Sequence, residues 1–165
     1  MIDDRHLTSV RAARLEDGPV ILAMLADLAS FEGADHRPRL DAAAMARDVF
    51  GPDPKLTVLV AEKAGLDAPV GFISYFENYS SWEGRAGIHI SDLWVSAADR
   101  GRGVGAALLR HVLARYAGRR IDVFVVRGND GARSVYERLG FKEQSQWCVY
   151  RIEGVLDDVA SQARI

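Results

Sequence analysis

Cysteine is nearly absent from this 165-residue sequence, which contains one residue of that type, Cys148. A single cysteine excludes an internal disulfide and any zinc site built on several thiolates. The four histidines are scattered without metal-ligand spacing, so we predict no metal centre. Cys148 is expected to be a small core residue.

The sequence also lacks an excess of one charge and a long apolar run. Lys and Arg number 21 against 23 Asp and Glu, a net charge of −2 that gives no broad positive field for nucleic acid. The longest apolar run, Val20 to Ala26, is far shorter than the about 20 residues that span a bilayer. The first five residues are acidic and carry no apolar signal core. We therefore expect a cytoplasmic protein that binds neither nucleic acid nor a membrane.

What is present is typical of one globular domain. Hydrophobic residues make up 48% of the chain and charged residues 27%, and a chain of this length buries roughly 68–70% of the surface that its unfolded form exposes. The sequence contains no internal repeat and no Pro/Gly/Ser-rich linker. We predict a single domain over residues 1–165.

Strands and helices are expected to alternate along the chain. The predicted strands are Thr8 to Ala12, Leu56 to Ala61, Val70 to Tyr75, Ile88 to Val95, Ile121 to Val126, Phe141 and Trp147 to Ile152. Four helices are predicted. The first begins after a capping Asp17, and the others cover Asp41 to Phe50, Val104 to near Gly118, and Gly131 to Leu139. This pattern predicts a mixed α/β domain.

The strand from Ile88 to Val95 carries an irregularity. Its apolar alternation passes through Ile88 and Ile90 and then changes phase to Leu93 and Val95. A β-bulge near residues 91–92 would absorb the extra residue and keep both apolar pairs on the core side. We predict a bulge there.

The stretch from Arg100 to Gly105 follows that strand and precedes a helix. Alternating glycines let the backbone approach a ligand, and a helix N-terminus suits a phosphate or pyrophosphate. A tight turn with two solvated arginines, Arg100 and Arg102, is the alternative. A nucleotide P-loop fails because no Gly-Lys-Ser/Thr closes the motif. A dinucleotide fingerprint through Ala106 and Asp122 is a minor alternative, because several elements precede it.

These residues resemble a known family. The stretch 100–105 is similar to the R/Q-x-x-G-x-G/A coenzyme A signature of GNAT N-acyltransferases. Leu93, Trp94 and Val95 match the family's bulged fourth strand, Asn129 and Tyr136 have its spacing, and residues 139–141 match its L-G-F ending. Residues 28–32, 75–76, 79–84 and 91–95 resemble the diamine (spermidine/spermine) and thialysine acetyltransferase branch.

The resemblance implies the acyl-CoA N-acyltransferase fold, an α+β arrangement whose mostly antiparallel twisted sheet is flanked by helices. The sheet would split between the strand ending at Val95 and the strand beginning at Ile121. The implied activity is acetyl transfer from acetyl-CoA to a primary amine by direct attack in a ternary complex. The acceptor would be a small molecule such as a diamine, a polyamine or an amino acid, and the branch implies a homodimer.

The resemblance also assigns candidate site residues. Tyr136 would protonate the departing thiolate. Cofactor binding is assigned to Leu93, Trp94, Val95, Arg100, Gly101, Arg102, Gly103, Val104, Gly105, Ala106, Asn129, Asp130, Gly131 and Ala132. Acceptor binding is assigned to Phe31, Glu32, Ser91 and Asp92.

Several alternatives stay open. Tyr136 lies on the apolar stripe of its helix and could be a core aromatic. The branch carries Glu where this chain has Ser91, and serine cannot serve as the base that removes a proton from the amine. The candidates for this base are Asp92 through a water, Glu32, His89 or a water chain. His111 is expected in the core or at an interface. Trp82 and Trp94 are expected to pack, with an acceptor pocket or a subunit contact as the alternatives. The rival functions are a protein N-terminal or lysine acetyltransferase and a non-catalytic coenzyme A-binding sensor.

Overall fold

The computed structural model of the chain describes residues 8–34 and 38–152. Its strands form one five-stranded sheet in the order β1-β2-β3-β4-β5. All neighbouring strands are antiparallel except β4 and β5, which are parallel. The strands are β1 (Thr8–Ala12), β2 (Thr57–Lys63), β3 (Gly71–Ser80), β4 (Arg85–Val95) and β5 (Ile121–Val123). The predicted mixed, mostly antiparallel sheet is confirmed.

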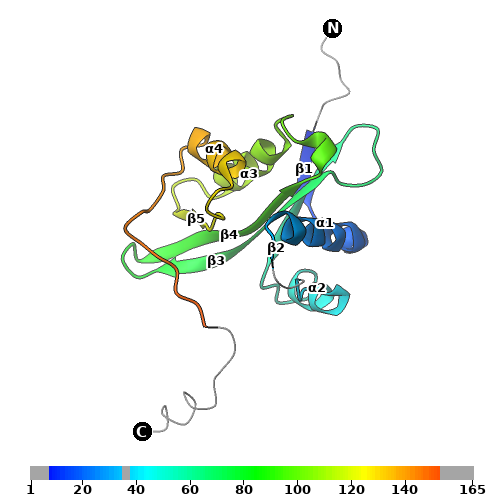
Figure 1. Cartoon of the computed structure of the whole chain (residues 1–165). Helices are drawn as coiled ribbons and strands as arrows, with labels where there is room; N and C mark the ends of the chain where they lie inside the picture. The colour runs from blue at the N-terminus through cyan, green and yellow to red at the C-terminus, as the bar shows by residue number, and fades with distance from the viewer. Residues whose placement is uncertain (1–7, 35–37, 153–165) are drawn as a thin grey trace.

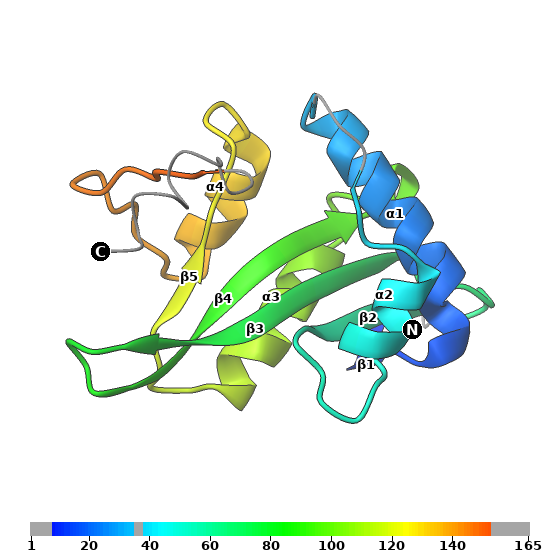
Figure 2. The ribbon, with the colours of Figure 1, turned by 90° about the horizontal axis from the view of Figure 1, so that it is seen from below.

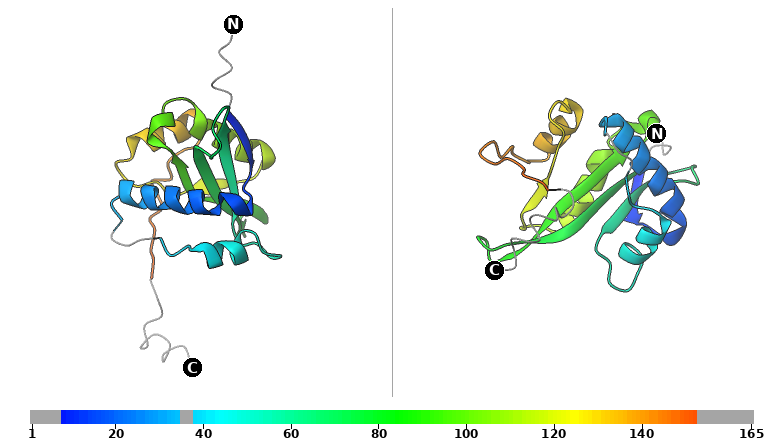
Figure 3. Two further views of the ribbon diagram at one scale, coloured as in Figure 1. Left: turned by 90° about the vertical axis from the view of Figure 1, so that its right-hand side faces the viewer. Right: turned by 60° about the horizontal axis from the view of Figure 1, so that its bottom comes forward.

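Four helices cover the two faces of this sheet. They are α1 (Gly18–Phe31), α2 (Ala42–Asp48), α3 (Val104–Arg115) and α4 (Asp130–Arg138). Helices α1 and α2 lie on one side of the strands, and α3 and α4 on the other (Figure 1; Figure 3, left). Among the described residues, each helix is too short or too polar to cross a membrane.

The core has two parts because the sheet is covered on both faces. One cluster joins β4 residues Ile88 and Ile90 to Leu108 and Leu109 of α3. The other joins Trp94 to Phe72 and to residues of α1 and α2. Helical and strand periodicities in the sequence therefore each direct one apolar face inward.

The predicted β-bulge in β4 is confirmed. Ser74 pairs with Asp92 while the next β3 residue, Tyr75, pairs with Ile90, which leaves Ser91 as the extra residue. Because of this extra residue, Leu93 and Val95 pack against the same cluster as Ile88 and Ile90.

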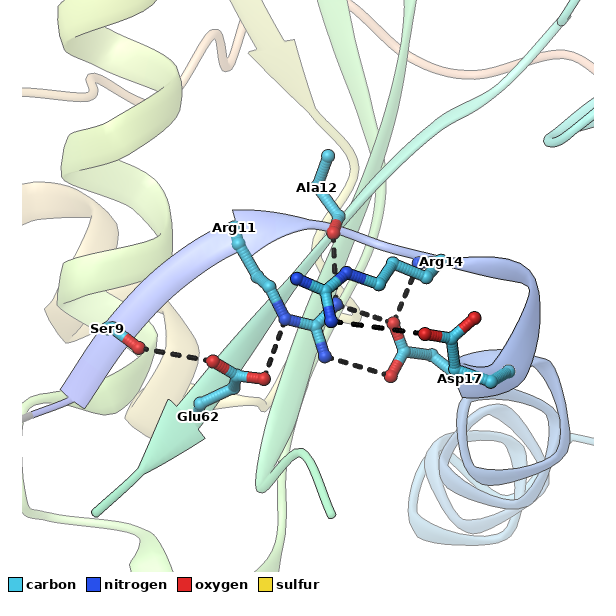
Figure 4. A network of polar contacts seen from close by, with 7 residues as sticks. Ser9, Arg11, Ala12, Arg14, Asp17 and Glu62 are labelled. Carbon is cyan, nitrogen blue, oxygen red and sulfur yellow. Dashed lines mark hydrogen bonds and ion pairs between the residues drawn. The ribbon is translucent and has the colours of Figure 1, made fainter. Parts of the chain in front are cut away.

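The entry to α1 is fixed by an ionic network. The carboxylate of Asp17 accepts hydrogen bonds from the Arg11 guanidinium at 2.6 and 3.0 Å and from the Arg14 backbone N–H at 2.7 Å (Figure 4). Arg11 also donates to Glu62 of β2 at 2.6 Å. The hydrogen bond from Arg11 holds the pKa of Asp17 below its usual value. Asp17 stands at the predicted cap position, but its side chain binds this network instead of a helix amide.

Some local predictions are wrong. Residues 141–152 contain no strand, and Cys148 in that segment is exposed. β5 ends at Val123 instead of Val126. Trp82 does not pack, because it is 91% exposed at the turn between β3 and β4. His111 is exposed on α3, which excludes the core position, while the interface position stays a prediction.

Candidate functional site

A cleft of ≈ 1690 Å³ separates the end of α1 from the β5–α4 side of the molecule. Figure 2 shows these two sides diverging on either side of β4. The cleft brings together every candidate site residue except Arg102 and Asp130. Asp130 lines a smaller adjoining hollow of ≈ 420 Å³ with Phe31 and Glu32. Residues far apart in the sequence thus meet at one site.

The floor of the cleft is the second half of β4, where the sheet splits. β5 pairs with β4 only from Ile88 to Ile90, so Leu93 and Val95 have a strand partner on the β3 side alone. Backbone N–H and C=O groups on the other edge of an extended segment can pair with an extended ligand. The predicted split of the sheet therefore leaves an open backbone edge inside the cleft.

The glycine loop lies at one end of this open edge. Gly101 and Gly103 have φ values of 73° and 84°, a left-handed conformation that favours glycine. Gly103 is the N-cap of α3 and supplies no side-chain cap bond. The first-turn N–H groups of the helix therefore face the cleft end without a side-chain partner, an arrangement that binds anions. Gly105 is helical, and a Cβ there would make only an ordinary contact with Val95 at 3.6 Å.

Two contacts anchor the chain before this loop. Lys63 at the end of β2 donates to the buried carboxylate of Asp99 at 2.8 Å. The Arg100 guanidinium lies 4.1 Å from the ring centre of Trp94 and 4.9 Å from that of Phe31, and its Nε donates to the Val95 carbonyl at 2.9 Å. Both arginines are exposed, but the Arg100 side chain is held by these contacts at the cleft, whereas Arg102 lies outside the cleft.

Tyr136 joins the core to the cleft. It is 7% exposed, packs edge to face on Phe141 at 5.3 Å, and lines the cleft wall. Burial, and secondly the charge of Glu32, raises the pKa of Tyr136 to about 12. The hydroxyl therefore carries its proton at neutral pH and can donate it. Tyr136 is thus a core aromatic that also forms part of the cleft wall.

Two carboxylates lie on the opposite side of the cleft. Glu32 stands at the C-terminal end of α1, and Asp92 lies next to the bulge, where its carboxylate accepts a hydrogen bond from the Ser74 hydroxyl. Partial burial raises the pKa of Glu32, and the neighbouring charge of Asp92 raises it further. The charge of Asp92 acts on Glu32, and the charge of Glu32 acts on Tyr136, so these three groups lie close enough to interact electrostatically.

Sequence reasoning underestimated two features of the site. Asn129 accepts the Ala132 N–H at 3.1 Å and so caps α4, a role that an Asn just before a predicted helix signals. The aromatic residues Phe76 and Phe124 line the cleft and flank His89, at ring distances of 5.1 and 4.6 Å. Nothing in the local sequence around Phe124 distinguishes it from a core strand residue.

Comparisons with known proteins agree with this geometry. The model of the acetyltransferase (GNAT) family matches residues 22–141. The thialysine N-epsilon-acetyltransferase of Mus musculus is 30% identical over 161 residues, which cover 89% of this chain and 93% of the mouse protein. The spermidine/spermine N(1)-acetyltransferase-like protein 1 of Homo sapiens is 34% identical over 108 residues, 62% of this chain and 15% of that protein. A crystal structure of a probable acetyltransferase has the same fold, with a TM-score of 0.74, 21% identity, and coverage of 90% of this chain and 99% of that one.

Proposed function

Because the chain belongs to the acetyltransferase (GNAT) family, we propose that this enzyme transfers the acetyl group of acetyl-CoA to a primary amine of a small molecule. The amine attacks the thioester directly in a ternary complex. The observation that carries the proposal is the meeting, in one cleft, of an uncapped helix start, an open strand edge and a largely buried tyrosine.

The backbone of one side of the cleft fits acetyl-CoA, which supplies an activated acetyl thioester when it is bound. The first-turn amides of α3 suit its pyrophosphate, because they carry the positive end of the helix dipole. We assign pyrophosphate binding to the cleft residues Arg100, Gly101, Gly103, Val104, Gly105 and Ala106. Arg102, which lies outside the cleft, would add positive charge to the same loop. Leu93, Trp94 and Val95 would pair with the pantetheine arm, and the N–H of Leu93 would stabilise the charge that develops on the thioester oxygen. Asn129, Asp130, Gly131 and Ala132 would contact the arm from the α4 side.

Tyr136 is assigned as the general acid. A departing thiolate needs a proton, and a tyrosine whose pKa burial raises to about 12 remains protonated until that step. The lining of the cleft by this otherwise buried residue supports the assignment.

The acceptor side suits a cation. Glu32 and Asp92 place two carboxylates in the cleft, where they would attract an ammonium group, and Phe31 and Ser91 lie beside them. The relatives named for thialysine and for spermidine/spermine support an acceptor whose amine ends a flexible chain, either an amino acid or a polyamine.

A coenzyme A release assay tests the function. Purified protein with acetyl-CoA is offered spermidine, thialysine, lysine and amino sugars, and thiol is measured together with the mass of the product. We expect thiol release that depends on at least one free amine, with an acetylated product. Release at background with every amine would overturn the proposal.

We further propose that the chain forms one domain and pairs with a second copy through its β5 side. β5 is an edge strand of the described sheet. The segment that follows α4 exposes large apolar side chains: Trp147, Val149, Tyr150 and Ile152. An exposed apolar patch and an open sheet edge are each typical of an interface, and light scattering measures the assembly mass directly.

A further inference from the structure

The proposed reaction needs a base, because an ammonium group has no lone pair with which to attack. Ser91, the bulge residue, cannot accept that proton at neutral pH. We infer that His89 accepts the proton of the acceptor's ammonium group, an inference that rests on the proposed function.

The position of His89 supports this role. It lies on β4, on the face opposite Ile88 and Ile90 and two residues before the bulge, and its side chain lines the cleft. The rings of Phe76 from β3 and Phe124 after β5 flank the imidazole at 5.1 and 4.6 Å. These two ring contacts restrict the positions that the imidazole can take beside the cleft.

The charges around His89 suit a base that is neutral before the reaction and charged after it. Partial burial lowers the pKa of His89, so the imidazole is neutral near pH 7 and keeps a free lone pair. Asp122 on β5 and Asp92 on β4 oppose this shift and would stabilise the imidazolium once formed. Asp122 is in turn paired with Arg120 at 2.9 Å. From β3, the facing residue is the uncharged Phe76.

The two carboxylates of the cleft are less suited to this step. A base works best when its pKa lies near the operating pH, and imidazole is the side chain whose ordinary pKa lies nearest neutrality. Asp92 already accepts the Ser74 hydroxyl. Glu32 and Asp92 serve better as fixed negative charges that hold the ammonium group.

The proton balance closes with these groups. His89 takes one proton from the ammonium nitrogen and passes it to solvent. The nitrogen lone pair forms the new C–N bond, and the C–S bond breaks with its electron pair going to sulfur. Tyr136 gives sulfur its proton and is restored by the second proton that the nitrogen loses. The net products are the amide, the free thiol and one proton in solvent.

The test compares His89→Gln with His111→Gln, the same change at an exposed histidine of α3 outside the cleft. We expect kcat/KM for the best amine to fall about 100-fold in His89→Gln and to stay at the wild-type value in His111→Gln. The acidic inflection in the pH profile of kcat should disappear in His89→Gln and persist in His111→Gln, because protonation of Glu32 acts on KM for the amine. Imidazole added to His89→Ala should restore part of the rate, which a purely structural role would not allow.

NMR titration of the free protein gives a readout independent of activity. The resonance that is lost in His89→Gln should titrate below the usual histidine pKa of about 6.5. The inference is overturned if His89→Gln keeps the wild-type pH profile, or if the acidic inflection is lost in Asp92→Asn and not in His89→Gln. Either result leaves the proposed function intact, whereas a wild-type protein that releases no thiol with any amine removes the function itself.

Discussion

The two sides of the cleft are built from different parts of the polypeptide. The side proposed for acetyl-CoA consists mostly of backbone: the open edge of β4, the left-handed glycines and the uncapped start of α3. The side proposed for the amine consists of side chains, chiefly Glu32, Asp92 and His89.

The two sides of the cleft differ in the substitutions that they tolerate. Backbone amides do not depend on side-chain identity, so the cofactor side is sensitive mainly to changes that alter φ and ψ. Carboxylates and imidazole act through their charge and pKa, so the acceptor side changes with each substitution. One fold can therefore keep a common acetyl donor while its acceptor differs.

The largest effect is expected where the two sides meet, at Tyr136. Tyr136→Phe removes the proton donor and keeps the ring that packs on Phe141. We expect kcat to fall by about 10²–10³-fold while acetyl-CoA affinity stays within about twofold, since loss of general acid catalysis acts on the chemical step. Single-turnover kinetics and equilibrium binding of acetyl-CoA separate the two quantities. An unchanged kcat would remove Tyr136 from the mechanism.

A smaller effect confined to the cofactor side is expected at Gly103. Gly103→Ala forces a Cβ into a φ of 84° and costs roughly 1–2 kcal/mol, so the loop should shift and KM for acetyl-CoA should rise about 10-fold. Gly105→Ala is the matched control, because its Cβ meets Val95 at an ordinary 3.6 Å. Steady-state kinetics at saturating amine measure both variants. Equal KM values would show that the left-handed glycine does not shape the donor site.

A still smaller effect, on the acceptor side alone, is expected at Glu32. Glu32→Gln removes one negative charge at a partly exposed position, so KM for the amine should rise about threefold, and less at high salt. Because partial burial and Asp92 raise the pKa of Glu32, wild-type amine affinity should fall as the pH drops through that pKa and Glu32 loses its charge. Glu32→Gln should lack this dependence of amine affinity on pH. A rise in KM for acetyl-CoA, with KM for the amine unchanged, would contradict the assignment of Glu32 to the amine side of the cleft.

The smallest kinetic effect is expected at Asp17, which lies outside both sides. Asp17→Asn breaks the pairing with Arg11 and should lower the free energy of unfolding by about 2 kcal/mol at pH 7, less than for a fully buried pair. The pKa of Asp17 is lowered in the folded protein, so its stabilisation is present above the unfolded pKa and is lost as the pH falls through the folded value. Urea unfolding from pH 7 to pH 3 should show less acid dependence in the variant, with both KM values unchanged.

Much of this molecule could be predicted from local sequence pattern. The phase change between Ile90 and Leu93 predicted the bulge. Without an extra residue, Leu93 and Val95 would leave the face on which Ile88 and Ile90 are buried. The glycines at 101 and 103 predicted a close turn before α3, because left-handed backbone is a local property.

Features that depend on distant partners could not be predicted in this way. Residues 147–152 have strand-like composition, yet a strand forms only beside a partner, and the described chain supplies none there. Asp17 was placed correctly at the start of α1, but its partner Arg11 comes from β1 and competes with the helix amides. Phe124 enters the cleft wall because the pairing of β5 with β4 ends at Val123, a boundary that the neighbours of Phe124 in the sequence do not encode.

The bulge sets different limits on substitution and on deletion at the same position. Ser91 stands outside the regular pairing of β3 and β4, so its side chain can be exchanged without disturbing the sheet. Removing the residue altogether would return β4 to strict alternation and move Leu93 and Val95 to the α1 face and Trp94 to the α3 face. We therefore expect related sequences to carry different residue types at this position of the strand but to lack insertions and deletions there.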